Sequence, residues 1–194
     1  MIDRKKFFQG IRHTPFPGRL EPATVRGITA ILDEWEKRKL RDLRHLAYML
    51  ATVLAECGRD MLPVREGFAK DDAGARRHVR RQKYKYTVEH NGHVYYGRGL
   101  VQLTWLRNYK TMGEILKLDL VNEPDLALRS DIAAAIMFEG MARGTFTGKK
   151  LTDYINDKGT DFRNARRIIN GLDRAEEIAS YAKQFYADLV AATS

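Results

Sequence analysis

The sequence predicts a mostly α-helical protein with one small β-hairpin. Apolar residues recur at helical spacing along several stretches, over about 23–38, 43–58, 131–143 and 174–192, and in one that begins near Thr104. Aromatic and β-branched residues flank Asn91-Gly92, a dipeptide that favours a tight hairpin turn. The 194 residues show no internal repeat and no linker, so we expect a single domain over 1–194 without a separate binding module.

Prolines, glycines and a capping residue mark the expected helix boundaries in the first half of the chain. Residues 1–21 are expected to be irregular, because prolines and a glycine interrupt them. Pro22 suits the first turn of a helix, Asp42 can cap the next helix, and Gly58 should end that helix. The basic stretch that follows, AKDDAGARRHVRRQKY, is either a short solvated helix or a mobile flap.

The second half should contain the hairpin and the remaining helices. Strands are expected over about 85–89 and 93–96, on either side of the Asn91-Gly92 turn. Ser130 can cap the helix that Gly144 ends. Shorter helical turns are expected near 151–155 and in FRNARRIIN, before the final helix.

The overall charge and the cysteine count narrow the function classes. The formal net charge of +9 favours an anionic partner: nucleic acid, a membrane surface or a cell wall. No nucleic-acid recognition motif is present, so we expect no nucleic-acid partner. The single cysteine, Cys57, excludes an internal disulfide framework and a cysteine zinc site, and we expect a small buried apolar residue there rather than a nucleophile.

No segment has the features of an export signal or a membrane span. The N-terminal stretch lacks the apolar run and the cleavage pattern of a signal peptide, and no run of 18 apolar residues occurs. We therefore expect no stable membrane insertion. If the protein acts outside its cell, another route must release it.

Glu56 stands out because it ends the apolar stretch LAYMLATVLAECG. A buried carboxyl group is costly unless it is paired, hydrogen-bonded or protonated, and a protonated acid is what a glycosidase needs to protonate its leaving group. The alternative is a surface acid where the helix reaches solvent. Glu66 follows ten residues later, in a loop that can turn back toward Glu56. Two acids separated by a water-sized gap suit inverting hydrolysis.

Polar side chains cluster after the expected hairpin. Gly97 and Gly99 lack the third glycine and the βαβ pattern of a phosphate loop, so we expect glycines that allow close backbone approach. Gln102, Thr104 and Asn108 can position a sugar or a water, although Thr104 can equally cap the next helix. Glu89, His90 and His93 invite a metal site, but a solvated hairpin tip is the preferred interpretation, and we expect no metal and no cofactor.

These residues carry a family resemblance. The pattern YYGRGxxQLTxxxNY over 95–109 resembles the signature of the glycoside hydrolase family 19 chitinases, and the chain as a whole resembles the small phage and prophage endolysins of Gram-negative bacteria within that family. The resemblance continues, in order, through IRHTPFPG, LAYMLATVLAE, NEPDLAL, GTFTGKKL and NARRIINGLD. It implies a lysozyme-like α-helical domain with a long substrate cleft. It also implies synthesis in the cytoplasm of a host and release to the periplasm or cell wall by another route, such as a holin.

The resemblance also implies roles for individual residues. Glu56 corresponds to the general acid, Glu66 to the second acid, and Thr104 to a residue that holds the nucleophilic water. The substrate-binding positions implied by the match are Tyr96, Arg98, Gln102, Asn108 and Asn170.

Two departures from the family pattern accompany these matches. The general acid is usually flanked by His and by Thr or Ser, whereas Ala55 and Cys57 flank Glu56. A shift of one residue would place Arg65 rather than Glu66 in the second acid's position.

The expected activity is inverting hydrolysis of β-1,4 bonds in peptidoglycan by a monomeric endolysin of lysozyme type. A chitinase acting on chitin-like polysaccharide is the alternative. A family member that has lost catalysis and binds glycan, or serves as a structural part of a particle, is a further alternative, which the residues beside Glu56 motivate.

Overall fold

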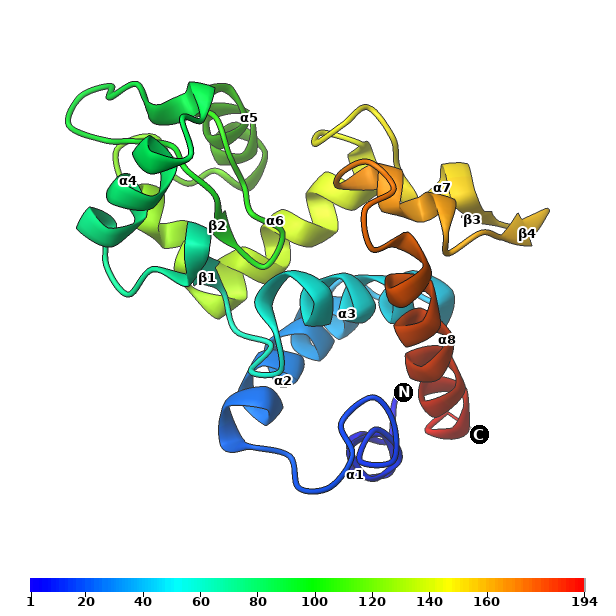
Figure 1. The fold of residues 1–194 in the computed structure, drawn as a ribbon. Coiled ribbons are helices and arrows are strands. Elements are labelled where there is room, and N and C mark those ends of the chain that lie inside the picture. The colour runs from blue at the N-terminus through cyan, green and yellow to red at the C-terminus, as the bar shows by residue number, and fades with distance from the viewer. Residues whose placement is uncertain (194) are drawn as a thin grey trace.

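The computed structural model describes residues 1–193 as a set of helices with two small two-stranded sheets (Figure 1). The helices are α1 Arg4–Gly10, α2 Pro22–Lys37, α3 Leu43–Cys57, α4 Asp72–Arg81, α5 Leu106–Leu116, α6 Ser130–Arg143, α7 Leu151–Tyr154 and α8 Ala175–Ala191. Short 3-10 turns cover Glu66–Phe68, Lys85–Thr87, Pro124–Leu128 and Asn164–Ile168. The strands are β1 Val64–Arg65, β2 Arg98–Gly99, β3 Ile155–Asn156 and β4 Gly159–Thr160. The predicted mostly α fold is confirmed.

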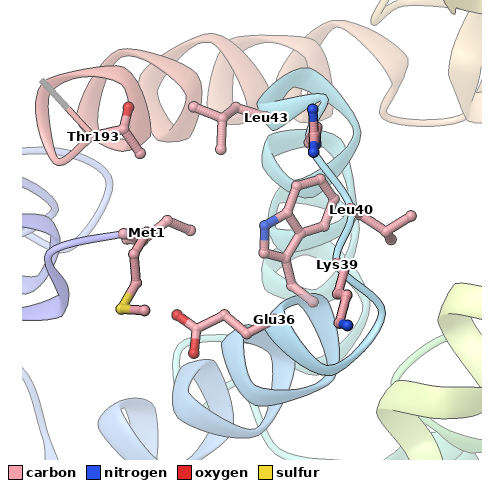
Figure 2. Close-up of a pocket in the computed structure, with 9 residues that line it drawn as sticks. Met1, Glu36, Lys39, Leu40, Leu43 and Thr193 are labelled. Carbon is pink, nitrogen blue, oxygen red and sulfur yellow. The ribbon is translucent and has the colours of Figure 1, made fainter.

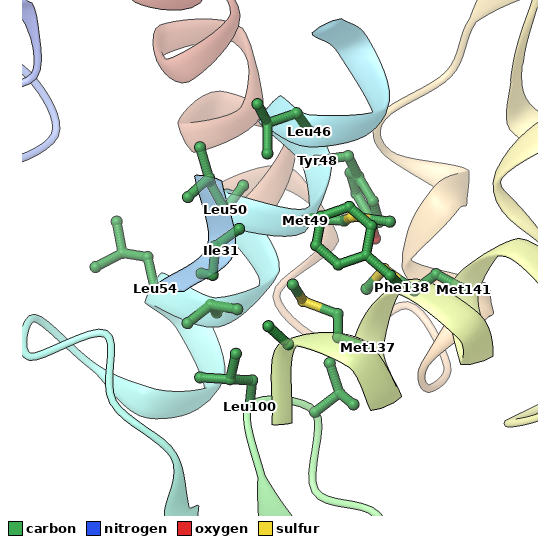
Figure 3. Close-up of a cluster of buried hydrophobic side chains, with 14 of the residues drawn as sticks. Ile31, Leu46, Tyr48, Met49, Leu50, Leu54, Leu100, Met137, Phe138 and Met141 are labelled. Atoms are coloured by element: carbon green, nitrogen blue, oxygen red, sulfur yellow. The ribbon is translucent and has the colours of Figure 1, made fainter. Parts of the chain in front are cut away.

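Helix α3 forms the centre of the main core. It packs along α8 and also contacts α2, while α2 and α6 pack against each other. Figure 3 shows its apolar side chains in one cluster with Ile31 of α2 and with Met137 and Met141 of α6. Leu46, Leu50 and Val53 are fully buried, and each such side chain stabilises the fold by about 1.5–3 kcal/mol. The buried helix predicted before Glu56 is therefore present, and the rest of the core forms around it.

The prediction that residues 1–21 are irregular is confirmed for 11–21 and was wrong for 4–10. Helix α1 forms there, because the Asp3 side chain accepts a hydrogen bond of 3.0 Å from the Lys6 backbone N–H and Phe7 is fully buried. The backbone N–H of Asp3 also donates to the carbonyl of Ala192 at 2.9 Å. This hydrogen bond joins Asp3 to Ala192 near the other end of the chain. Helix α1 has only seven residues, which is too short for its apolar residues to form a recognisable helical pattern in the sequence.

The hairpin predicted around Asn91-Gly92 is reduced to its turn. Asn91 and Gly92 have positive φ values of 51° and 80°, and only His90 and His93 pair across them. The expected first strand is instead a 3-10 turn at Lys85–Thr87. Tertiary contacts override the local strand preference, because Tyr86 turns toward Glu66 and Val94 enters a small second core.

That second core supports a lobe made of α4, the β1–β2 pair and α5 (Figure 1). Ala75 and Val79 bury one face of α4 against Val94 and Tyr96, so the basic stretch is a helix rather than a flap. Strands β1 and β2 are antiparallel, with Val64 opposite Gly99. Gly99 has a φ of 91°, and a Cβ there would lie 2.9 Å from the Ala127 carbonyl oxygen, so only glycine fits.

Two further features of residues 1–193 bear on the expectations. None of the described helices is both long and apolar enough to span a membrane. Within the same residues, His, Cys, Asp and Glu side chains form no group of three or more that is placed to hold a metal ion.

Candidate active site

A cleft of about 330 Å³ lies between the C-terminal end of α3 and the lobe that contains α4 and α5. It brings together most of the residues singled out from the sequence, from four separate parts of the chain. Its walls are formed by Glu56, Glu66, Tyr86, Val101, Gln102, Thr104, Trp105, Asn108, Phe146, Ile169 and Asn170.

A separate hollow of about 460 Å³ lies between the ends of the chain and the C-terminal end of α2. Figure 2 shows it bounded by Met1, Thr193 and Glu36. It contains none of the predicted site residues. Because it has a single carboxyl group and an otherwise mainly apolar wall, it lacks the paired acids that glycosidic hydrolysis requires.

Glu56 occupies the last turn of α3, where its side chain is 21% exposed. Its Oε1 accepts a hydrogen bond from Nη1 of Arg166 at 2.6 Å. Arg166 is nearly fully buried, and its Nε donates to the carbonyl of Asp173 at 3.0 Å, so the guanidinium is held from two sides. Among residues 1–193, no protein group hydrogen-bonds Oε2 of Glu56, which leaves that oxygen available to a substrate.

Arg166 was not among the residues selected from the sequence. It lies in the 3-10 turn Asn164–Ile168, which comes more than a hundred residues after Glu56. The local signal was an arginine beside residues that are themselves buried, Ala165 and Ile168. A buried arginine requires a partner, but the sequence does not say which acid supplies it.

Glu66 stands on the opposite part of the cleft, at the start of the turn that follows β1. Its backbone N–H donates to the carbonyl of Gly97 at 2.8 Å, and its Oε2 accepts from the backbone N–H of Gly97 at 2.7 Å. Its Oε1 accepts a short hydrogen bond from the Tyr86 hydroxyl. Burial and this contact with Glu66 both raise the pKa of Tyr86, so the phenol remains a donor. The position of Glu66 is thus set by three hydrogen bonds.

Thr104 lines the same cleft and does not cap α5, whose N-cap residue is Trp105. Its hydroxyl donates to the Gln102 carbonyl at 2.7 Å. A hydroxyl whose proton is engaged in this way can still accept a hydrogen bond, so Thr104 is suited to receive one from a water.

The two amides near Thr104 are held by the backbone. Asn108 Nδ2 donates to the Thr104 carbonyl at 2.8 Å, and Gln102 Nε2 donates to the Val64 carbonyl at 3.1 Å. Each amide oxygen lacks a protein donor among residues 1–193. Asn170 completes the polar lining on the far side, next to Ile169.

The structure places Tyr96 and Arg98 outside the cleft, so the substrate-binding role expected for them is not supported. Tyr96 is fully buried, and its hydroxyl donates to Asp72 at 2.8 Å. Arg98 is 2% exposed, lies 3.6 Å from the centroid of the Tyr96 ring and forms an ion pair of 2.8 Å with Asp125. Both residues stabilise the lobe, because a buried arginine must satisfy its donors internally. Arg65 also pairs with Asp125, which leaves Glu66 as the acid that faces the cleft.

Ala55 and Cys57, which flank Glu56, both make contacts with distant segments. Cys57 is buried, and its Sγ lies 3.7 Å from the Gly99 carbonyl and 3.5 Å from the Leu100 carbonyl. Burial strongly raises the pKa of the Cys57 thiol, so it is not a nucleophile at neutral pH. The carbonyl of Ala55 accepts from Arg174 Nη1 at 2.7 Å.

Residues 64–143 match a family model described as Chitinase class I, the model of glycoside hydrolase family 19. This segment is similar to glycoside hydrolase family 19. The matched segment contains Glu66, Gln102, Thr104 and Asn108, whereas Glu56 and Asn170 lie outside it on either side.

Curated relatives match short stretches of the chain. An inactive chitinase-like protein from Hevea brasiliensis is 48% identical over 50 residues, which are 24% of this chain and 16% of that protein. An endochitinase of Arabidopsis thaliana is 46% identical over 43 residues, or 22% of this chain and 15% of the relative. The chain therefore spans about a sixth of the length of these relatives in the matched regions.

Solved structures share the whole fold. Chitinase C from Streptomyces griseus superposes with a TM-score of 0.65 at 23% identity, over 97% of this chain and 92% of that one. A bacterial family 19 chitinase gives a TM-score of 0.63 at 24% identity, over 97% and 94% of the two chains. The fold is thus that of family 19 chitinases along nearly its full length.

Proposed function

We propose that the protein is a glycoside hydrolase that cleaves β-1,4 bonds between amino sugars with inversion. The observation that supports this most directly is that Glu56 and Glu66 line one cleft together with Thr104. Each acid is held by a different set of donors, Glu56 by Arg166 and Glu66 by Tyr86 and the Gly97 N–H. The matched segment and the shared fold support the same class of reaction.

In this proposal Glu56 is the general acid. Its Oε2 donates a proton to the glycosidic oxygen as the bond to the anomeric carbon breaks. Glu56 lies in the last turn of α3, where Nη1 of Arg166 donates to its Oε1 at 2.6 Å. Arg166 thus fixes where Oε1 lies, so the proton-bearing oxygen has one orientation toward the cleft.

Glu66 and Thr104 act on the water. Glu66 is the general base in this proposal, and the Tyr86 hydroxyl and the Gly97 N–H orient its carboxyl group. A water that donates one hydrogen to Glu66 and the other to the Thr104 hydroxyl presents a lone pair to the anomeric carbon. Glu66 takes the water's proton as the new C–O bond forms, on the face opposite the leaving group, which gives inversion.

We propose peptidoglycan as the substrate, and an endolysin as the biological role. The net charge of +9 supports an anionic polymer, and chitin is uncharged. The named relatives are chitinases and the matched stretches are short, so chitin is the second candidate substrate. Purified peptidoglycan and colloidal chitin, digested side by side, test the choice. Release of soluble sugars from chitin alone would reverse it.

The reaction itself is tested by replacing one acid at a time. Glu56→Gln and Glu66→Gln should each abolish release of soluble fragments and leave the circular dichroism spectrum unchanged. Glu114→Gln, an exposed acid on α5, is the matched control and should retain full activity. Near-normal turnover by Glu56→Gln would refute its role as the general acid.

A glycan-binding protein without catalysis is a second candidate function. Ala55 and Cys57 beside Glu56 motivate it, and one relative is named as inactive. Sedimentation of the wild-type protein with peptidoglycan, without soluble products between pH 4 and 9, would favour this candidate over hydrolysis.

A further inference from the structure

Arg76 of α4 has surroundings different from those of Arg77 and Arg81. Arg76 is neutralised by Asp72 at 2.6 Å and by Glu89 at 2.7 Å. Arg77 and Arg81 are exposed, and neither forms an ion pair or a side-chain hydrogen bond with any of residues 1–193. They are one helical turn apart, so their guanidinium groups project from the same side of α4.

These two free arginines line a hollow of about 440 Å³ on the surface of the lobe. Gly67, Ala69, Gly74 and His78 form the rest of its wall. The small residues create the space, since a Cβ on Gly67 would lie 2.6 Å from the His78 ring. No acidic residue lines the hollow, and the nearby Asp71 is engaged in accepting a hydrogen bond of 2.7 Å from the Gly74 N–H.

The hollow and the cleft share a wall. The turn Glu66–Phe68 presents Glu66 to the cleft and Gly67 to the hollow. Phe68 on the same turn is 65% exposed. A polymer that occupies the cleft and leaves it across this turn therefore brings its substituents to Arg77 and Arg81.

We propose that Arg77 and Arg81 form a subsite for carboxylates carried by the glycan strand. Arginine binds carboxylates through paired, charge-assisted hydrogen bonds, and two guanidinium groups can hold two carboxylates or one from both sides. Peptidoglycan presents such groups on the lactyl-linked peptides of every second sugar, whereas chitin has none. This inference rests on the proposed function, because it assigns the polymer that the cleft would process.

The test compares the double variant Arg77→Ala/Arg81→Ala with the wild type on charged and uncharged substrates. The double variant should bind phosphate-free peptidoglycan roughly tenfold more weakly than the wild type does, and its rate of peptidoglycan hydrolysis should fall in parallel. Hydrolysis of soluble chito-oligosaccharides should be unchanged. Amidation of the peptidoglycan carboxylates should weaken wild-type binding to the level of the variant, which identifies carboxylate rather than phosphate as the ligand.

A charge-matched control and a binding readout keep the outcomes separate. Arg26→Ala/Lys183→Ala removes the same charge from exposed positions on α2 and α8 and should bind peptidoglycan as the wild type does. An equal loss in that control, or an equal loss on chito-oligosaccharides, would overturn the subsite. Binding measured in the Glu56→Gln background does not need catalysis. The wild type could bind peptidoglycan in a way that amidation of the carboxylates weakens, yet release no soluble products. That outcome would refute the proposed hydrolase activity and support the subsite.

Discussion

The hydroxyl of Tyr86 donates a hydrogen bond to Oε1 of Glu66. Tyr86 itself lies between two other aromatic rings, stacked on Tyr84 with centroids 5.3 Å apart and edge-on to Trp105 at 5.2 Å. Tyr84 and Trp105 are each 39% exposed. Tyr86 thus orients one oxygen of the Glu66 carboxyl group, and Trp105, which lines the cleft beside it, offers an exposed aromatic face on which a sugar ring can pack.

Removing the Tyr86 hydroxyl should impair the chemical step more than binding. In Tyr86→Phe the ring packing is kept, but Glu66 loses one of the donors that set its orientation, so we expect kcat to fall about ten- to a hundredfold with little change in KM. Tyr84→Phe is the matched control, because no hydrogen bond of its hydroxyl is formed within residues 1–193. Equal kinetics for both variants would show that the hydrogen bond to Glu66 has no role in turnover.

Arg166 should act as a positioning residue for Glu56. Arg166→Gln removes the 2.6 Å contact and leaves Glu56 free to rotate, so we expect kcat to fall about a hundredfold and the free energy of unfolding to drop by about 1–3 kcal/mol. Arg166→Lys should restore part of kcat. The exposed neighbour Arg167, changed to Gln, serves as the control. Full activity in Arg166→Gln would contradict the positioning role.

Arg98 should matter for stability rather than for substrate binding. Replacing it with Met would leave Tyr109 and Asp125 without their buried partner, so we expect the free energy of unfolding in urea to fall by about 2–4 kcal/mol. The exposed Arg129, changed to Met, should cost far less. A folded, stable Arg98→Met protein with a raised KM would instead restore the binding role expected from the sequence.

Glu139 should contribute stability that is lost in acid. Burial alone would raise its pKa, but hydrogen bonds from Arg143 and Arg38 outweigh burial and hold the pKa of Glu139 below 4.5. The unfolded chain therefore binds this proton first, so the contribution is present above pH 4.5 and disappears as the pH falls through the lowered value. Glu139→Gln should be less stable than the wild type at pH 7, and the difference should narrow as the pH falls below 4.5. A difference that stays the same over this range would refute this.

Local patterns were sufficient for the long helices and for part of the cleft. The apolar periodicity of α2, α3 and α8 reflects burial against a core, and the motif around Gln102, Thr104 and Asn108 lies within a single short segment. These features depend on residues that are near one another in the chain, so the sequence carries them directly.

The remaining features depend on contacts between distant segments. The partner of Glu56 comes from the region of Arg166, and the partner of Glu66 comes from a stretch that was expected to be a strand. Tyr96 and Arg98 lie inside the family pattern, yet their side chains point into the lobe. There Tyr96 hydrogen-bonds Asp72, and Arg98 forms an ion pair with Asp125. A spacing pattern reports which residues recur together, not which side of the backbone each one faces.

The short segment Gly97–Leu100 touches both halves of the candidate site. The N–H of Gly97 holds Glu66, while the carbonyls of Gly99 and Leu100 contact Cys57, the residue next to Glu56. The positions of the two acids relative to each other therefore depend on this shared segment, which contacts Glu66 directly and Glu56 through its neighbour Cys57. A one-residue insertion within 97–100 would therefore displace both acids at once, because each acid or its neighbour contacts this segment.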